Sequence, residues 1–270
     1  MSKKLLIGIF KWLLGFYLVV LLLLYLFQDK IIFQATSLPQ DFKFSFDQQF
    51  DEKTFTTPDG VALNTLFFPA NGKSKGLIFY CHGNRRNLKT WGRFARSFTK
   101  NGYDIFMWDY RGFGKSEGKP SEYNIFSDAE FIYDKMSEKY PENKIIVYGR
   151  SLGTGVATKL AAGYSPKKLL LETPYYSMAD VGKKQFPFLP YSLLIKHPFR
   201  TDRYILKVKC PIHIFHGTDD ELVPYESSLD LAKVLNKEPT ELITTIEGGG
   251  HRGLERFDEY QIRLSELLEN

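Results

Sequence analysis

The hydrophobic pattern begins with one long apolar run. Residues 5–27 are almost wholly apolar, and Lys11 is the only charged residue among them. As a helix, this segment spans about 35 Å, which exceeds the roughly 30 Å thickness of a bilayer's hydrocarbon core. Lys3 and Lys4 precede the run and Lys30 follows it. The positive-inside rule therefore predicts a single-pass helix with a cytoplasmic N-terminus and the rest of the chain on the non-cytoplasmic side.

A cleaved signal peptide is the competing interpretation of this run. Its apolar region would normally be shorter and would end near a small-x-small cleavage site. The segment Ala35-Thr36-Ser37 offers such a site, but it lies well beyond the apolar stretch, past Asp29 and Lys30. We therefore expect an uncleaved anchor over residues 1–29 and a single further domain over residues 30–270, a normal length for one domain.

Beyond residue 30, apolar runs of strand length alternate with helical patterns. The expected strands cover residues 50–56, 61–68, 77–80, 105–108, 144–148, 168–171, 212–215 and 241–246. The expected helices cover residues 91–100, 125–139, 152–162, 226–235 and 254–268. Such alternation predicts an α/β fold with a mostly parallel central sheet and helices on both faces. The turn Thr57-Pro58-Asp59-Gly60 joins the first two strands as a hairpin.

One long insertion, residues 174–207, interrupts this alternation. It is rich in proline and in aromatic residues, namely Tyr175, Tyr176, Phe186, Phe188, Tyr191 and Phe199. Long loops in compact domains are often lids. The segment is either a small lid that lines an apolar acyl pocket, or a set of aromatic side chains that pack over the edge of the sheet.

Charge and cysteine content narrow the class of protein further. The formal net charge is +5, of which +3 falls in residues 1–30, so the domain carries only about +2 (5 − 3). That charge gives no reason to expect a nucleic-acid partner, while basic residues near the membrane attract anionic lipid. Cys81 and Cys210 fall at opposite ends of their strands, so we expect buried free thiols. The chain shows no metal-ligand spacing, and we expect no metal and no cofactor.

The first candidate for chemistry is the pentapeptide Gly149-Arg150-Ser151-Leu152-Gly153, between a predicted strand and a predicted helix. In a strand–turn–helix context, G-x-S-x-G is a nucleophile elbow. The turn is so tight that side chains two residues before or after the serine would collide, which explains both glycines. Since the pentapeptide also occurs by chance, its context carries the interpretation.

Two later loops supply a candidate acid and a candidate base. Asp219 and Asp220 follow the strand over residues 212–215, and His251 follows the strand over residues 241–246. The order nucleophile, acid, base is that of the α/β-hydrolase triad, and loops at the carboxyl ends of parallel strands converge at one edge of a sheet. Spacing alone leaves both aspartates open as the acid.

The chemistry requires these residue types. A serine hydroxyl becomes a good nucleophile when a neighbouring histidine takes its proton, and a carboxylate fixes the tautomer of that histidine. The oxyanion needs fixed donors. We expect them to be the backbone N–H of Leu152 and a backbone N–H from the turn His82-Gly83-Asn84, namely that of Asn84.

Several stretches carry a family resemblance, namely Cys81-His82-Gly83-Asn84, residues 109–118, the elbow, Cys210-Pro211, His216-Gly217 and Gly250-His251. With them, residues 30–270 resemble the α/β-hydrolase superfamily. The nearest branch contains the Bem46-like proteins and the membrane-associated α/β-hydrolase domain proteins 13 and 17, and is similar to the serine aminopeptidase group. The resemblance implies an α/β-hydrolase fold with a small lid. It also implies that the acid is Asp220, four residues after His216.

These observations predict a membrane-anchored serine hydrolase that cleaves esters or thioesters of hydrophobic acyl groups through an acyl-serine intermediate. Its partners would be the acyl substrate and, through the N-terminal helix, membrane lipid. A serine peptidase on the same triad is the alternative, and a non-catalytic binding module is a further one. The sequence leaves the oligomeric state open.

Two histidines and one turn receive structural interpretations. We expect His82 to support the oxyanion turn and His216 to brace the loop of Asp220. We expect the segment Asp109-Tyr110-Arg111-Gly112 to be a turn with an internal ion pair. Arg150, inside the elbow, is a weaker candidate for contact with the substrate.

Overall fold

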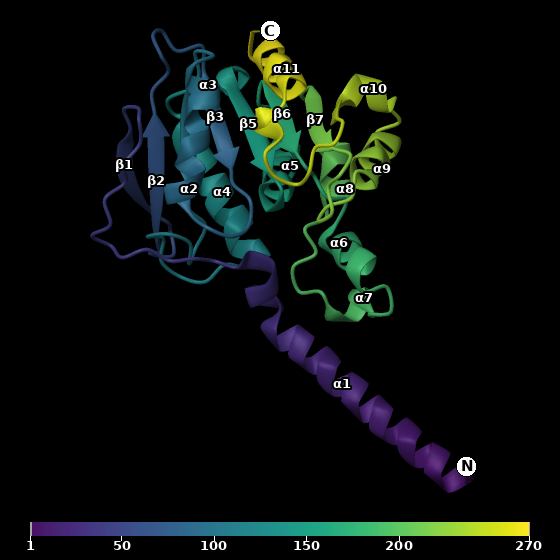
Figure 1. Ribbon diagram of the computed structural model, residues 1–270. Coiled ribbons are helices and arrows are strands. Elements are labelled where there is room, and N and C mark those ends of the chain that lie inside the picture. The colour runs from purple at the N-terminus through teal and green to yellow at the C-terminus, as the bar shows by residue number, and fades with distance from the viewer. Residues whose placement is uncertain (1, 270) are drawn as a thin grey trace.

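The apolar run forms one continuous helix, α1 (Lys3–Phe33), in the computed structural model, which describes residues 2–269 (Figure 1). Ser2 caps it by accepting a hydrogen bond from the N–H of Leu5. The helix is long and apolar enough to cross a membrane. It ends at Phe33 and not near residue 27, because its last turn packs into the domain, where Phe33 is only 1% exposed.

All eight expected strands form, and they join one sheet in the order β1-β2-β4-β3-β5-β6-β7-β8. Their bounds are β1 (Asp51–Thr56), β2 (Ala62–Phe68), β3 (Leu77–Cys81), β4 (Asp104–Trp108), β5 (Ile145–Arg150), β6 (Lys168–Glu172), β7 (Ile212–Gly217) and β8 (Ile243–Ile246). β2 runs antiparallel to both β1 and β4, and every other neighbouring pair is parallel. The predicted mostly parallel sheet is therefore confirmed.

The strand order creates a topological switch point at the centre of the sheet. β3 pairs with β4 on one side and with β5 on the other, so the chain winds outward from β3 in both directions. Ligands of open α/β sheets bind outside the carboxyl ends of the strands at such a switch point. The loops that follow β3 and β5 contain the expected oxyanion turn and the elbow.

Helices cover both faces of the sheet, as predicted. Buried residues of α4 (Glu122–Ser137), α5 (Leu152–Gly163) and α9 (Glu226–Val234) form the core on one face. Those of α2 (Leu88–Trp91), α3 (Arg96–Thr99) and α11 (Asp258–Glu269) form the core on the other. The inserted segment, residues 174–207, contains three short helices, α6 (Met178–Gln185), α7 (Tyr191–Leu194) and α8 (Thr201–Tyr204).

Two expected elements have different bounds. The helix expected over residues 91–100 is broken into α2, a 3₁₀ turn and α3, since Gly92 lies where the Phe46 ring packs on the backbone. A Cβ on Gly92 would lie 2.4 Å from that ring, and glycine is a poor helix former. The strand expected from residue 241 begins at Ile243, because Pro239 starts the short helix α10 (Pro239–Leu242).

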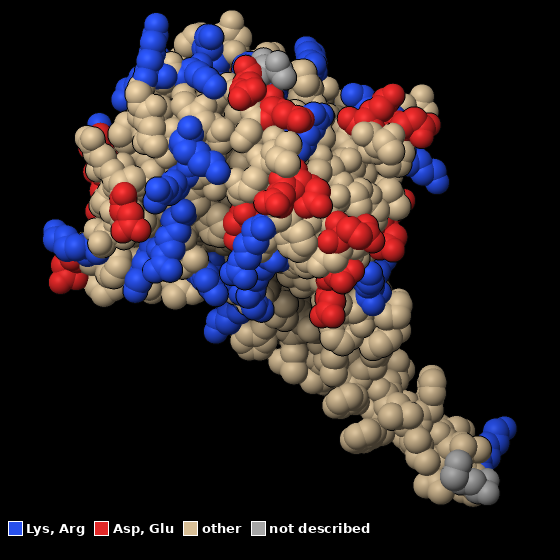
Figure 2. All heavy atoms as spheres, turned by 45° about the horizontal axis from the view of Figure 1, so that its top comes forward, with Lys and Arg blue, Asp and Glu red and all other residues tan. Residues whose placement is uncertain are grey.

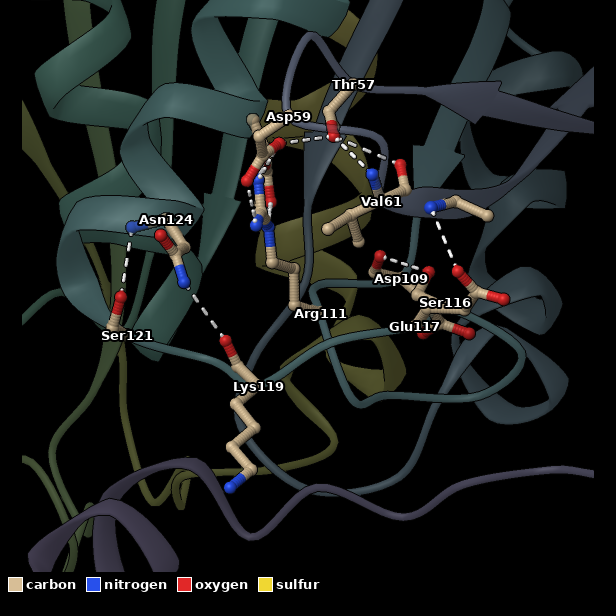
Figure 3. A network of polar contacts seen from close by, with 12 residues as sticks. Thr57, Asp59, Val61, Asp109, Arg111, Ser116, Glu117, Lys119, Ser121 and Asn124 are labelled. Carbon is tan, nitrogen blue, oxygen red and sulfur yellow. Dashed lines mark hydrogen bonds and ion pairs between the residues drawn. The ribbon is translucent and has the colours of Figure 1, made fainter.

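The expected ion pair between Asp109 and Arg111 is wrong. Arg111 donates from Nε to Asp128 of α4 at 2.8 Å and from Nη1 to Asp59 of the β1–β2 turn at 2.7 Å (Figure 3). The hydrogen bond from Arg111 lowers the pKa of the Asp59 carboxyl. Asp109 instead accepts from the N–H of Leu88 at 3.0 Å. Arg111 thus joins the hairpin turn to α4 across the edge of the sheet.

Both cysteines are free thiols. Cys81 is buried, and burial raises the pKa of its thiol. Cys210 is only partly buried, so the expectation of burial holds for Cys81 alone.

Candidate active site

Ser151 occupies a strained turn between β5 and α5. Its φ of 51° and ψ of −119° are rare for a residue with a side chain and persist only where the surrounding structure enforces them. A Cβ on Gly149 would lie 2.6 Å from the carbonyl oxygen of Gly153, and one on Gly153 would lie 2.0 Å from that of Cys81. Both elbow glycines are therefore required by close backbone contacts.

The structure brings the three expected side chains into one line. Ser151 Oγ lies 2.9 Å from His251 Nε2, and His251 Nδ1 lies 2.8 Å from Asp220 Oδ2. An ionised carboxylate only accepts hydrogen bonds, so Nδ1 carries the proton and Nε2 is free to accept one from the serine. The arrangement can remove a proton from Ser151 and stabilise the imidazolium that results.

Asp220, and not Asp219, faces the histidine. Asp220 is buried, and its Oδ1 accepts hydrogen bonds from the N–H groups of Leu222 at 2.9 Å and Val223 at 2.8 Å. Burial raises the pKa of Asp220, but hydrogen bonds from His216 and His251 lower it by more, so the net pKa lies well below its usual range. The carboxylate therefore stays charged. The exposed Asp219 side chain accepts from the hydroxyl of Thr218.

The two supporting histidines lie where the sequence predicts. His216 Nε2 lies 3.2 Å from Asp220 Oδ2, and its Nδ1 lies 2.6 Å from Ser228 Oγ, so it fixes the acid loop against α9. His82 lies 2.7 Å from the carbonyl oxygen of Gly83, and its other ring nitrogen faces Asp109 at 3.4 Å. Both histidines are fully buried and brace loops behind the site.

The turn after β3 adjoins the nucleophile. A Cβ on Gly83 would touch the Ser151 Cβ at 3.4 Å, and both Asn84 and Leu152 line a cavity together with Ser151. Leu152 begins α5, so its N–H has no acceptor inside the helix. The side chain of Asn84 donates to the carbonyl oxygen of Ile32 in α1 at 3.2 Å, which ties this turn to the N-terminal helix. The role of the two N–H groups as oxyanion donors stays a prediction.

Two cavities of different chemistry meet at Ser151. The first, of about 360 Å³, we call the arginine pocket, because five arginines line it. They are Arg85, Arg86, Arg150, Arg252 and Arg256. The second, of about 460 Å³, we call the apolar slot. It runs between α1 and the inserted segment, and its lining includes Leu24 and Ile31 of α1 with Val181, Leu189 and Leu194 of the insertion.

Arg150 is mainly structural. It is 4% exposed, its Nε lies 3.1 Å from Glu172 Oε1, and its guanidinium lies 4.6 Å from the centre of the Phe94 ring. It nevertheless lines the arginine pocket. Arg150 can therefore contact a substrate only through the atoms that face the arginine pocket.

Both interpretations of the insertion apply, each to different residues. Tyr175 and Phe199 are 1% and 0% exposed and pack into the core beside α5. Phe186 and Phe188 are 51% and 70% exposed at the far end of the insertion. The base of the segment is therefore core packing, while α6 and α7 form a small lid over the apolar slot.

Sequence reasoning missed the part that α1 plays in this site. Inside an almost uniformly apolar run, no pattern distinguishes the face that packs on a protein from the faces that meet lipid. Gln28 was the available signal, because it is a polar residue at the end of that run and is 8% exposed.

The sheet order, the strained elbow and the acid and base on later strand-end loops define the α/β-hydrolase class. The family model described as serine aminopeptidase, S33, matches residues 72–194, a range that includes Ser151 but ends before Asp220 and His251. Among curated proteins, the chain is 30% identical over 220 residues to human α/β hydrolase domain-containing protein 17B, covering 78% of this chain and 73% of that one. It is also 30% identical over 205 residues to an uncharacterized protein of Mycobacterium tuberculosis, covering 75% and 72%.

Solved structures share the fold at lower identity. An esterase from Pyrococcus furiosus superposes with a TM-score of 0.67 at 22% identity, covering 88% of this chain and 98% of that chain. The α/β hydrolase GrgF of a Penicillium species gives a TM-score of 0.64 at 16% identity, covering 81% and 96%. By its 30% identity to α/β hydrolase domain-containing protein 17B, the chain belongs to the α/β-hydrolase family.

Proposed function

We propose that this protein is a membrane-anchored serine hydrolase that cleaves esters or thioesters of hydrophobic acyl groups. The observation that carries the proposal is the continuous line from Ser151 Oγ through His251 to Asp220, at distances of 2.9 Å and 2.8 Å. Distances of this size are those of hydrogen bonds, so a proton can pass from the serine to the imidazole without rearrangement.

The proposed reaction has two halves. Ser151 Oγ attacks the acyl carbon while His251 Nε2 takes the hydroxyl proton, and the N–H groups of Leu152 and Asn84 stabilise the oxyanion. When the bond from carbon to the leaving oxygen or sulfur breaks, His251 returns the proton to the leaving group. Water then attacks the acyl-serine with the same histidine as base, releasing the acid and restoring the hydroxyl.

The apolar slot supports a hydrophobic acyl group as substrate. It reaches Ser151 and is lined mostly by aliphatic and aromatic side chains of α1 and the lid, as expected of a site that binds hydrocarbon. A volume of about 460 Å³ falls within the usual range for small-molecule sites.

We further propose that α1 remains attached as a single-pass anchor, with the catalytic domain on the non-cytoplasmic side. The helix has a mean hydropathy of 2.4 over its most apolar window. Cleavage at Ala35-Thr36-Ser37 would remove Phe33, which is 1% exposed in the core of the domain. Such a loss would leave a large cavity, and truncations of buried phenylalanine typically cost about 3–5 kcal/mol.

A serine peptidase is the second candidate, favoured by the description of the matching family model. Binding a peptide amine would need acidic groups at the site. Among the residues that line the arginine pocket, Glu255 is the one carboxylate beside five arginines. Release of aminoacyl fluorophores by the purified protein, without ester cleavage, would reverse this ranking.

The test compares the wild-type chain with Ser151→Ala. We expect the wild type to react with a fluorophosphonate probe and to hydrolyse short p-nitrophenyl esters, and the variant to do neither. Activity that survives in Ser151→Ala refutes the assignment of the nucleophile. A folded wild-type chain that does not react with fluorophosphonate would instead favour a non-catalytic binding module.

A further inference from the structure

We propose that α1 is one wall of the acyl-binding site, so that an acyl chain reaches Ser151 directly from the bilayer, between α1 and the lid. This inference rests on the proposed function and adds the origin and shape of the substrate. It makes the helix a part of the binding site as well as an anchor. The ligand is a lipid, or a lipid-modified molecule, whose chain remains in the apolar layer while its ester or thioester reaches the nucleophile.

One face of α1 packs against the protein. Its partly covered or buried positions, 17, 20, 21, 24 and 28, recur at helical spacing, while the residues between them are exposed. The hydroxyl of Tyr17 donates to the carbonyl oxygen of Phe188 in the lid at 3.2 Å. From Tyr17 to Gln28 these contacts extend about 16 Å along the helix axis, at 1.5 Å per residue.

A polar clamp fixes how α1 and the lid lie against each other. Gln28 Nε2 donates to the carbonyl oxygen of Leu194 at 2.9 Å, and the N–H of Lys196 donates to Gln28 Oε1 at 2.7 Å. At the next residue of each segment, Asp29 Oδ1 lies 2.9 Å from His197 Nε2. A buried amide is costly unless both of its ends are hydrogen-bonded, and here both are. The contact between α1 and the lid is therefore specific.

The apolar slot lies between these two elements. Leu24, Gln28 and Ile31 line it from α1, and lid residues line it from the other side. Ile31 and Phe186, at its border, are 52% and 51% exposed, so the slot opens to the surroundings between α1 and the lid. Its inner end is at Ser151 and Leu152. A chain that enters between the helix and the lid thus arrives at the reacting hydroxyl.

The open side of the slot faces the apolar layer of the membrane. Tyr17 lies within the stretch expected to cross the bilayer, so the lid tip that contacts it lies at the same depth. That tip exposes Phe188 and Leu193 by 70% and 80%. Exposed apolar surface beside a membrane helix indicates contact with lipid. Lys196 lies 4.4 Å from the ring of Tyr25, a pairing typical of the interface between tails and headgroups.

Substitutions on opposite faces of α1 test this inference in the full chain, reconstituted in phosphatidylcholine nanodiscs. Leu24→Trp fills the slot, Leu24→Ala enlarges it, and Leu23→Trp is the matched control on an exposed face of the same helix. The measurement is the ratio of kcat/KM for p-nitrophenyl laurate to that for p-nitrophenyl butyrate. Labelling by dodecyl and ethyl fluorophosphonates gives the same comparison without turnover.

We expect Leu24→Trp to lower the laurate-to-butyrate ratio by roughly tenfold or more, since each lost methylene site is worth about a fourfold factor. Leu24→Ala should shift the preference toward longer chains, and Leu23→Trp should keep the wild-type ratio. Ratios that stay unchanged in both Leu24 variants, or that change equally in Leu23→Trp, overturn the inference. A wild-type chain that hydrolyses no ester but is labelled more readily by the dodecyl than by the ethyl probe contradicts the proposed function and leaves the acyl site standing.

An independent observation points to the other end of the substrate. The arginine pocket, which also reaches Ser151, is lined by five arginines and one carboxylate, that of Glu255. Nη1 of the buried Arg150 has no hydrogen-bond partner among the described residues. Figure 2 shows Lys and Arg side chains gathered on the domain near the point where the nearly uncharged α1 leaves it. We infer that the leaving group carries negative charge.

Matched leaving groups test this second inference. The substrates are the butyrate esters of o-nitrophenol and of 3-hydroxy-4-nitrobenzoate, which differ by one carboxylate. We expect the double variant Arg86→Gln, Arg252→Gln to lower the anionic-to-neutral ratio of kcat/KM several-fold at low salt, and 0.5 M salt to shrink that difference. Arg93→Gln is the control, an exposed arginine outside the pocket lining. A ratio that is equal in the wild type and the double variant overturns the inference.

Discussion

Two regions meet at Ser151, and they are built in opposite ways. On the sheet side, Asp220 is buried and held by two backbone N–H groups and two histidines, while the elbow is fixed by close backbone contacts. On the side of α1, the lid tip is exposed, and side chains of α1 such as Tyr17 and Gln28 attach to it. The groups proposed to react thus sit on rigid elements, while the proposed route for the substrate lies where few contacts have to open.

The largest expected effect is the loss of activity on substitution of the acid, Asp220. Asp220→Asn should reduce kcat for p-nitrophenyl butyrate by about 10⁴, because the amide favours the wrong tautomer of His251. Asp219→Asn is the matched control, since its side chain is exposed and does not contact the histidine. Steady-state kinetics of both variants decide the matter, and equal losses would show that the loop, and not the carboxylate, is being disturbed.

The next test concerns the rigidity of the elbow. A Cβ on Gly153 would lie 2.0 Å from the Cys81 carbonyl oxygen, a backbone atom that cannot easily move. Gly153→Ala should therefore destabilise the fold by about 3 kcal/mol or more. Gly163→Ala lies in the same helix with nothing within 4 Å of the added carbon, and should be neutral or stabilising by up to about 1 kcal/mol. Thermal denaturation of the two variants tests the difference; similar melting temperatures would contradict it.

A smaller effect is expected from the clamp between α1 and the lid. Gln28→Leu keeps the size of the side chain but leaves the carbonyl of Leu194 and the N–H of Lys196 without their partner. The loss of about 1–3 kcal/mol should appear as faster amide hydrogen exchange in residues 186–196, with exchange in β5 unchanged. Phe27→Leu, on an exposed face of α1, serves as the control. Slower or unaltered exchange in the lid would mean that the clamp does not hold it.

The smallest effect is a pH dependence at the base of the lid. Glu122 accepts a hydrogen bond from the N–H of Phe199 at 3.1 Å, and burial raises its pKa from 4.5 to about 7. Because the folded pKa is the higher one, the ionising carboxyl destabilises the fold as pH rises from about 4.5 through 7. Glu122→Gln should thus raise Tm by a few degrees relative to the wild type at pH 8, and not at pH 4. Equal differences at both pH values would contradict the shift.

The fold was predictable because its central strands are buried on both faces and appear as short apolar runs, such as the one that becomes β5. Ser151 was predictable because a tight turn admits glycine alone at two nearby positions. The spacing of the residues in the sequence could not decide between Asp219 and Asp220, since the answer depends on which of the two adjacent side chains turns toward His251. The partners of Arg111 come from a distant turn and from α4, so only the tertiary structure reveals them.

The continuous helix α1 also determines which substrate concentration controls the rate of this protein. On the proposed anchoring, the domain and its substrate diffuse in the same two-dimensional sheet of lipid. Turnover then depends on the mole fraction of substrate in that sheet and not on the amount per litre of solution. Adding inert lipid at constant total substrate would slow such a catalyst by dilution within the surface.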